Sequence, residues 1–284
     1  MSNEPGRLYV VATPIGNRAD LSERAREVLA GVDCVAAEDT RHTGRLLAHW
    51  GLRPTLVSFH EHNELARIEG VRARLRAGQS VAVVSDAGTP LISDPGYRLV
   101  RELRFDGIAI EVVPGPCSIT AALSVAGLPT DRFVYEGFLP QRASARRQRL
   151  QALAGETRTL VVLESSHRIR QSIDDMVAVF GSEREATICR ELTKVHETVR
   201  LDSLAGLSDW LAGDANQRRG EFVVVIRGAP EATTAGLDKE SERILDLLAA
   251  ELPTKQAARL AAGITGCPRN TLYAYAIARD SGDD

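Results

Sequence analysis

The sequence predicts an α/β protein with two modest α/β domains followed by a small helical tail. Short apolar runs alternate with longer segments in which apolar residues recur at helical spacing, a pattern typical of a mostly parallel sheet with right-handed crossovers. Hydrophobic residues make up 44% of the chain but aromatic residues only 5%. We therefore expect a core of Val, Leu, Ile and Ala between each sheet and the helices on its faces. The length of 284 residues is sufficient for two such domains.

The first domain is expected to comprise residues 1–117. Its first helix is indicated by a polar start at residues 20–23, by apolar residues at helical spacing and by Gly31 at its end. The expected strands lie at residues 8–12, 34–37, 56–58, 81–84 and 110–113. The expected helices lie between them and end near residues 31, 50, 77 and 104.

The second domain is expected at residues 118–230. It begins with a helix of small residues, 119–126, which we interpret as the hinge between the domains. Further strands are expected at residues 133–135, 159–163, 186–189 and 222–226, and helices at 144–154, 169–180 and 204–212. Residues 228–236 are rich in Pro, Gly, Ala and Thr, which predicts a linker to the tail.

In the tail, residues 237–284, the pattern over residues 253–273 predicts a helix, a glycine turn and a second helix. This spacing is similar to that of helix-turn-helix domains. From residue 236 onward the sequence contains six Lys or Arg and eight Asp or Glu. This balance does not favour binding of nucleic acid by the tail alone, so docking or dimerisation stays open as its role.

Composition excludes several classes of protein. The net charge of −3 argues against binding of polyanions through bulk charge, although a local basic patch is compatible with it. The four cysteines, at positions 34, 117, 189 and 267, are too far apart for a zinc motif or a disulfide framework, which fits a reducing cytoplasm. The first twenty residues lack the apolar core of a signal peptide, and no apolar run approaches the roughly 18 residues of a membrane span. We expect a cytoplasmic protein with no membrane contact.

The segment 85–96, SDAGTPLISDPG, follows the apolar run 81–84 and predicts a long loop at the carboxyl end of a buried strand. Ligands of open α/β sheets bind at such loops. Gly88 allows the backbone to approach a ligand closely, while Asp86 and Thr89 offer an acceptor and a hydroxyl. The loop is therefore expected to bind a small polar molecule.

The turn at residues 13–17, TPIGN, stands where a dinucleotide-binding protein carries G-x-G-x-x-G, and that motif is absent, as is a G-x-x-x-x-G-K-[ST] loop. A nicotinamide dehydrogenase and a P-loop ATPase are thus disfavoured. Residues 38–42, EDTRH, are either the polar start of a helix or a polar pocket wall. Residues 60–63, HEHN, fit a solvated loop better than a metal site.

Two charged segments, 164–168 and 190–197, follow the expected strands 159–163 and 186–189. A charge run is usually a solvated face. Two of them in equivalent positions, each with an acid, a base and a His, supply what deprotonation of a hydroxyl nucleophile needs. Residues 141–149 contain four arginines and no acid, which predicts an exposed basic helix face. Together with Arg168, Arg170, Arg218 and Arg219 they could instead form a phosphate-binding surface.

Seven segments in this order make the chain similar, over essentially its whole length, to the tetrapyrrole methylase superfamily of S-adenosylmethionine-dependent (class III) methyltransferases. Each segment is modest alone, but seven in sequence order are highly specific. They are LYVVATPIGN (8–17), AEDTRHTGRLL (37–47), SDAGTPLISDPGY (85–97), VVPGPCSITAALSVAGLP (112–129), EGFLP (136–140), ESSHR (164–168) and RELTKVHE (190–197). The last two segments and the tail favour the branch that acts on ribosomal RNA.

The resemblance implies two α/β domains of the tetrapyrrole-methylase type that enclose S-adenosylmethionine in the cleft between them, usually in a homodimer. It implies that Pro14 and Ile15 line the cleft and that Asp86, Gly88 and Thr89 hold the amino-acid part of the cofactor. Ser118, Ile119, Leu163 and Glu164 would flank the adenosine.

The same resemblance implies 2′-O-methylation of a cytidine ribose in small-subunit (16S) ribosomal RNA, presented free or in an assembled 30S subunit. Methyl transfer from a sulfonium needs alignment and a base but no metal. We expect Lys194 or Glu191 to activate the 2′-hydroxyl and Glu164 to orient the ribose. Positioning of the RNA is an equally weighted alternative role for Lys194 and Glu191. The expected RNA-binding residues are Arg146, Arg147, Arg149 and Arg168. A tetrapyrrole methyltransferase and a non-catalytic RNA- or ribosome-binding factor are the alternative functions.

Overall fold

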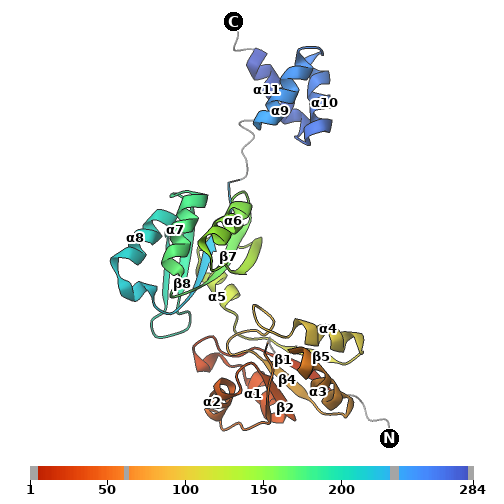
Figure 1. Cartoon of the computed structure of the whole chain (residues 1–284), viewed down its shortest axis with the longest axis vertical. Coiled ribbons are helices and arrows are strands. Elements are labelled where there is room, and N and C mark those ends of the chain that lie inside the picture. The colour runs from red at the N-terminus through yellow and green to blue at the C-terminus, as the bar shows by residue number, and fades with distance from the viewer. Residues whose placement is uncertain (1–5, 61–63, 231–236, 281–284) are drawn as a thin grey trace. The chain divides into compact units, whose positions relative to one another are not determined.

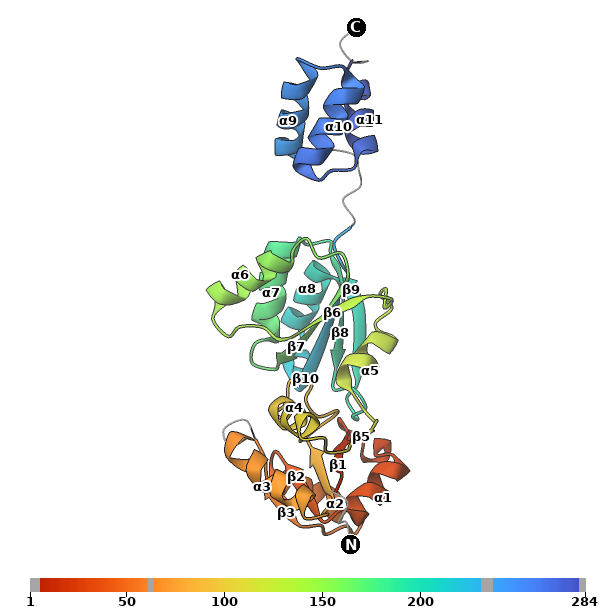
Figure 2. The ribbon, with the colours of Figure 1, turned by 90° about the vertical axis from the view of Figure 1, so that its right-hand side faces the viewer.

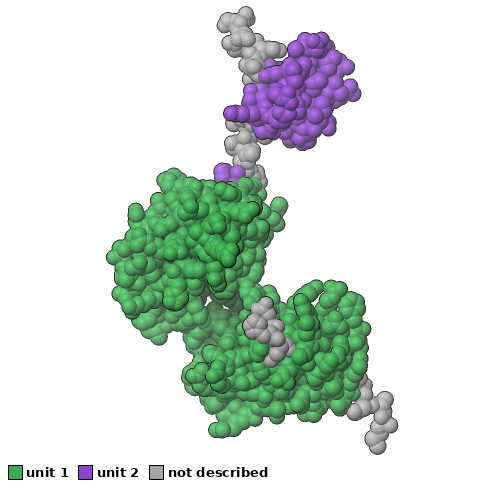
Figure 3. All heavy atoms as spheres, viewed as in Figure 1, with its two compact units in different colours: residues 1–228 green, residues 229–284 purple. Residues whose placement is uncertain are grey.

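The computed structural model describes residues 6–60, 64–230 and 237–280, with side chains up to residue 277. The chain forms two compact units, residues 1–228 and 229–284 (Figure 3). Residues 61–63 of the expected solvated loop and residues 231–236 of the expected linker lie outside the described part. Unit 1 contains two five-stranded sheets, and the described residues of unit 2 form three helices (Figure 1). The expected α/β architecture with a helical tail is confirmed.

The first sheet is parallel throughout, in the order β3-β2-β4-β1-β5. Its strands are β1 (Leu8–Val11), β2 (Cys34–Ala37), β3 (Leu56–Ser58), β4 (Val81–Val84) and β5 (Ile110–Val113). Every residue of β2 and β4 is buried, as expected of strands covered on both faces. One face packs against α1 (Glu23–Gly31) and α2 (Thr40–Ala48), and the other against α3 (Glu64–Arg76) and α4 (Tyr97–Phe105).

The second sheet is mixed, in the order β6-β7-β10-β8-β9. Its strands are β6 (Phe133–Phe138), β7 (Thr159–Ser165), β8 (Glu185–Arg190), β9 (Thr198–Ser203) and β10 (Glu221–Ile226). Strand β10 runs antiparallel to both β7 and β8, so these two strands run in the same direction and end at the same edge of the sheet. That edge also holds the first residue of β10, Glu221.

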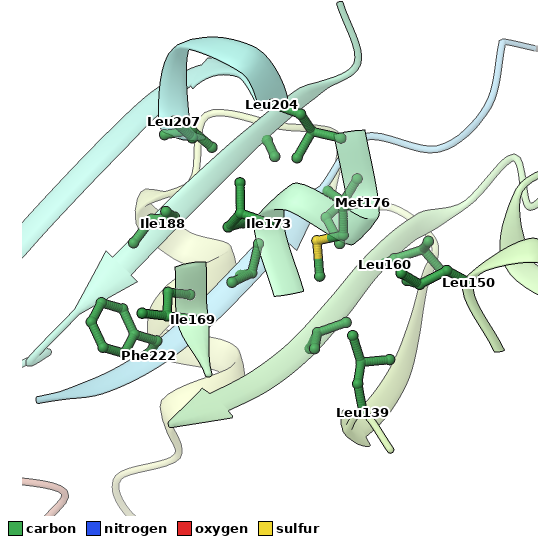
Figure 4. Close-up of a cluster of buried hydrophobic side chains, with 14 of the residues drawn as sticks. Leu139, Leu150, Leu160, Ile169, Ile173, Met176, Ile188, Leu204, Leu207 and Phe222 are labelled. Carbon is green, nitrogen blue, oxygen red and sulfur yellow. The ribbon is translucent and has the colours of Figure 1, made fainter. Parts of the chain in front are cut away.

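Helices cover both faces of this sheet (Figure 2). On one face, Ile169, Ile173 and Met176 of α7 (Ile169–Phe180) pack against strand residues such as Ile188 (Figure 4). The helices α6 (Ala143–Leu153) and α8 (Leu204–Gly213) complete that layer. On the other face lies α5 (Ser118–Val125), the expected helix of small residues, with Ile119 buried in the core.

Unit 2 consists of α9 (Lys239–Ala249), α10 (Thr254–Thr265) and α11 (Arg269–Asp280). A small core of Leu and Ala side chains, including Leu245, Ala258 and Leu272, holds the three helices together. Helix α10 is capped at its C-terminus by Gly266, whose φ of +76° favours glycine. The expected helix, glycine turn and helix are present, preceded by α9. Within the described residues, every helix is too short or too polar to cross a lipid bilayer.

Candidate active site

The loops that follow β1 and β4 are joined to each other at the carboxyl edge of the first sheet. Thr13 and Gly88 exchange backbone hydrogen bonds of 2.9 and 3.0 Å, and Thr13 Oγ1 donates to the Ser85 carbonyl over 3.2 Å. Gly88 has a φ of +81°, and a Cβ at this position would lie 3.2 Å from Ile15 Cγ2. Only a glycine therefore fits easily where the two loops meet.

The loop after β4 is held in an unusual backbone conformation. Leu91 and Ser93 have φ values of +72° and +64°, which L-residues rarely adopt. Ser93 Oγ is hydrogen-bonded to the Tyr135 hydroxyl of β6, and Thr89 Oγ1 donates to the Pro116 carbonyl over 3.0 Å. Such strain persists where neighbouring contacts fix the chain, commonly at ligand-binding sites.

Three carboxyl groups interact at this loop: Asp86 and Asp94 of the loop itself, and Glu38, which follows β2. Asp86 Oδ1 accepts a hydrogen bond of 3.0 Å from the Asp39 backbone N–H, and the Asp86 N–H donates to Glu38 Oε2 over 3.4 Å. Burial raises the pKa of Asp94 to about 6; a hydrogen bond from Ser85 opposes this shift, while the charges of Glu38 and Asp86 add to it. Among the described residues, no group of acids, His and Cys has the arrangement of a metal site.

The loop after β8 packs against the loop after β1. The Asn17 backbone N–H donates to Thr193 Oγ1 over 3.0 Å. Gly16 approaches the second loop so closely that a Cβ on it would lie 2.4 Å from Lys194 Cγ. Glu191 and Thr193 have φ values of +51° and +66°, so this loop is strained like the one after β4.

Lys194 is held between two carboxylates. Its Nζ lies 2.8 Å from Glu191 Oε1 and 3.0 Å from Glu221 Oε2. Burial acts to lower the pKa of Lys194, but the hydrogen bonds to Glu191 and Glu221 outweigh it and raise the net pKa above its ordinary value. Burial likewise acts to raise the pKa of Glu191, and the bonds from Lys194 and the Glu221 N–H reverse that effect, so the net pKa is lowered. Lys194 is thus a cation and Glu191 a carboxylate at neutral pH.

Glu164 is a buried, fully partnered carboxylate. Its oxygens accept hydrogen bonds from the Ser165 N–H over 2.8 Å and from Ser172 Oγ over 2.5 Å. Arg168 Nη2 lies 2.7 Å from Glu164 Oε1, with the Glu164 side chain 0% exposed. These bonds fix the position of the carboxylate that is expected to orient the ribose, and that role stays a prediction.

Two adjoining pockets lie among these loops. The smaller, about 340 Å³, is lined by Ile15, Ser118, Leu163 and Glu164, and the larger, about 600 Å³, by Pro14, Ile15, Asp86 and Lys194. The expected cofactor residues Gly88, Thr89 and Ile119 line neither pocket; the first two shape the loop and Ile119 packs in the core. Both volumes lie within the usual range for small-molecule sites, roughly 300–1,000 Å³.

The expectation that Arg146 belongs to an exposed basic face is wrong. Arg146 is 2% exposed, and its Nε lies 2.7 Å from Asp175 Oδ2, because residue 146 falls on the face of α6 that carries the buried Leu150. Arg147 Nε also pairs with Asp175, over 2.6 Å.

The other two arginines assigned to RNA are also bound to acids. Arg149 is half-exposed and pairs with Glu136 over 2.6 Å. Arg168 is mostly buried and pairs with Glu164. None of the four arginines lines either pocket.

Sequence reasoning missed Glu221 and Phe138. Glu221 lines both pockets, and Phe138, 55% exposed, lines the smaller one. Phe138 ends β6, beyond the end of the expected strand 133–135. Glu221 directly precedes the expected strand 222–226, and its place at the site follows from β10 lying between β7 and β8, which no local pattern records. The segment 38–42 is both the polar start of a helix and part of a pocket wall, because Asp39 caps α2 and His42 lines the larger pocket.

Comparison with known proteins gives consistent matches over both units. Residues 7–208 match the family of Tetrapyrrole (Corrin/Porphyrin) Methylases, and residues 235–280 match the RsmI C-terminal HTH domain. Two relatives are named ribosomal RNA small subunit methyltransferase I. The Pseudomonas aeruginosa protein is 55% identical over 278 residues, which cover 96% of this chain and 98% of the relative. The Escherichia coli O157:H7 protein is 51% identical over 275 residues, with coverages of 97% and 96%.

A solved structure of similar fold is the uroporphyrin-III C-methyltransferase of Thermus thermophilus complexed with S-adenyl homocysteine. It aligns with a TM-score of 0.53 and 21% identity over 78% of this chain and 97% of that chain. At 21% identity this match shows only that the two folds are similar. The family match covers residues 7–208, well over half of the chain, and the relatives span nearly its full length. The chain therefore belongs to the tetrapyrrole (corrin/porphyrin) methylase family.

Proposed function

We propose that the chain is an S-adenosylmethionine-dependent methyltransferase that modifies the 2′-oxygen of a cytidine ribose in small-subunit (16S) ribosomal RNA. The observation that carries this proposal is the extent of likeness to proteins named for that class of substrate. The two relatives are 55% and 51% identical over both the methylase region and the tail. If the likeness were confined to unit 1, it would support a methyltransferase activity but would not indicate the substrate.

The smaller pocket fits the methyl donor. Ile15, Leu163 and Phe138 give it apolar walls suited to an adenine ring. Its two acids, Glu164 and Glu221, are paired with Arg168 and Lys194, which lie outside its lining. Among the described residues no Lys or Arg lines this pocket, which suits a ligand with a positive sulfonium. When bound there, S-adenosylmethionine supplies an electrophilic methyl group.

Of the residues that would activate the acceptor, Glu221 lines both pockets and Lys194 lines the larger one. Glu191 lines neither pocket and reaches the site through its ion pair with Lys194. A ribose 2′-hydroxyl is a weak nucleophile at neutral pH, so its proton must move as the new C–O bond forms. Because the pKa of Lys194 is raised, Lys194 is the cation that stabilises the developing alkoxide, and it is not the base. We assign acceptance of the proton to a carboxylate beside it, Glu191 or Glu221.

Transfer of labelled methyl groups tests the proposal. The purified full chain is incubated with labelled S-adenosylmethionine and either free small-subunit RNA or assembled 30S subunits that lack the modification, and the methyl group is mapped. We expect one labelled ribose, and turnover lower by roughly two to four orders of magnitude for Lys194→Met, with unchanged affinity for the donor in calorimetry. Labelling of uroporphyrinogen in place of RNA, or no labelling at all, would contradict the proposal.

We also propose a homodimer that works in the cytoplasm, where ribosomal subunits are made, with the two α/β domains dividing near residues 117 and 118. Support for the dimer comes from the edge strand β9, where Val199 is 39% and Leu201 48% exposed. An edge strand with exposed apolar residues favours pairing. Light scattering of the wild type and of Leu201→Lys tests this point: the variant should be monomeric, and a monomeric wild type would refute the dimer.

A further inference from the structure

The larger pocket differs from the proposed donor pocket in its charge. The smaller pocket contains two carboxylates and, within the described part of the chain, no Lys or Arg. The larger pocket is lined by Arg18, His42, Arg45 and Lys194 in addition to Asp86 and Glu221. The two pockets share Ile15, Ala87 and Glu221, so a ligand in one lies beside a ligand in the other.

No carboxylate of the described residues neutralises the charge of Arg18 or Arg45. Arg18 Nη1 lies 3.4 Å from His49 Nδ1, and Arg45 Nε donates to the Arg41 carbonyl over 3.3 Å. Neither guanidinium is within ion-pair distance of a carboxylate of the described residues, although the neighbouring Arg41 pairs with Asp39 over 3.1 Å. Lys194 differs from both, because Glu191 and Glu221 already balance its charge.

Both arginines are carried by capped helical turns. Arg18 begins the 3₁₀ turn η1 (Arg18–Asp20), where Asn17 accepts a hydrogen bond from the Ala19 N–H. Arg45 lies three residues after His42 on α2, so the two side chains share a helix face. The helix is capped by Asp39, whose side chain accepts from the N–H groups of Arg41 and His42. Positions fixed in this way suit recognition of a ligand with a defined geometry.

We infer that the larger pocket binds a phosphodiester group adjacent to the target ribose, with Arg18 and Arg45 as its ligands. The inference rests on the proposed function. Guanidinium groups form charge-assisted, often bidentate hydrogen bonds with phosphate oxygens. A phosphate here would place the attached sugar near Lys194 and near Glu221, which belongs to the wall shared with the donor pocket. The donor, which carries a net positive charge, is better matched to the pocket without arginines.

The same positive charge could bind a different anion, the carboxylate of the methyl donor, and the experiment separates the two. Arg18→Ala, Arg45→Ala and Arg45→Lys are compared with Arg26→Ala, an exposed arginine of α1 that lines neither pocket. The measurements are KM for 30S subunits, binding of the subunit RNA at several salt concentrations and the calorimetric affinity for S-adenosylmethionine. Thermal unfolding verifies that each variant is folded.

We expect Arg18→Ala and Arg45→Ala each to weaken the RNA interaction roughly ten- to a hundredfold. The slope of log affinity against log salt should fall by about one for each variant. Donor affinity should be unchanged, Arg26→Ala should match the wild type, and Arg45→Lys should retain the salt slope while losing part of the affinity.

Two results would overturn the inference. RNA binding equal to that of Arg26→Ala would remove the phosphate site, and a loss of donor affinity with unchanged RNA binding would assign the arginines to the donor carboxylate. A wild type that methylates no ribosomal substrate would refute the proposed function instead. The binding measurements would still decide the phosphate site in that case.

Discussion

Gly16→Ala is the smallest change that should separate the two loops at the active site. The added Cβ would lie 2.4 Å from Lys194 Cγ, 2.9 Å from Thr193 Oγ1 and 3.2 Å from the Leu192 carbonyl. Carbon atoms in ordinary contact are about 3.5 Å apart or more, so the loop must move by about 1 Å to admit the methyl group. The movement would also stretch the hydrogen bond from the Asn17 N–H to Thr193 Oγ1, now 3.0 Å.

We expect turnover of Gly16→Ala to fall roughly a hundredfold, because a displacement of about 1 Å is enough to misalign reacting groups to that extent. The assay is methyl transfer from labelled donor to 30S subunits at saturating substrate, with thermal unfolding measured in parallel. Gly70→Ala is the matched control, since Gly70 lies in α3 with nothing within 4 Å of the added Cβ. It should raise stability by about 0.5–1 kcal/mol and leave turnover unchanged. A Gly16→Ala enzyme with wild-type turnover would refute the argument that this contact aligns Lys194.

Two further predictions concern buried charge. Asp175→Ala leaves the Arg146 guanidinium buried without its carboxylate, so it should lower the free energy of unfolding by about 3–5 kcal/mol in a denaturant titration. Arg147→Ala, which removes an exposed partner of the same carboxylate, should lower it by less than about 1 kcal/mol. Equal losses for the two variants would contradict this assignment of the buried pair. Because burial raises the pKa of Asp94 from 3.8 to about 6, the wild type should lose stability as pH rises from about 4 to 6. Asp94→Asn should not lose this stability, because an amide does not ionise. The Tm of the variant should therefore equal that of the wild type below pH 4 and exceed it by a constant amount above about pH 7. A Tm difference that does not depend on pH would refute the raised pKa of Asp94.

Most of the first sheet could be predicted from sequence because its strands are short, buried apolar runs followed by polar turns. The turn at residues 13–17 and the loop at residues 85–96 were each expected to follow a strand, and the parallel arrangement of β1 and β4 brings the two together at Thr13 and Gly88. The strand β9 was missed because its alternating pattern, with Val199 and Leu201 exposed, follows the charged run 190–197 without a break. An edge strand with one polar face gives only a weak apolar signal.

The error over Arg146 has a different origin. Positions 146, 150 and 153 share one face of α6, so helical spacing placed Arg146 beside two buried leucines. What the spacing could not supply is the partner, Asp175, which lies on α7 and reaches Arg146 only through tertiary packing. Glu221 was missed for a similar reason, because its contact with Lys194 depends on the order of strands in the second sheet.

The division of the site into a donor pocket and an acceptor pocket is tested most directly by a crystal structure with S-adenosylhomocysteine. The adenosine should lie between Ile15 and Leu163 in the smaller pocket, with the sulfur directed toward the wall that holds Glu221. Density for the nucleoside in the larger pocket, against Arg18 and Arg45, or at any site outside both pockets, would contradict the account.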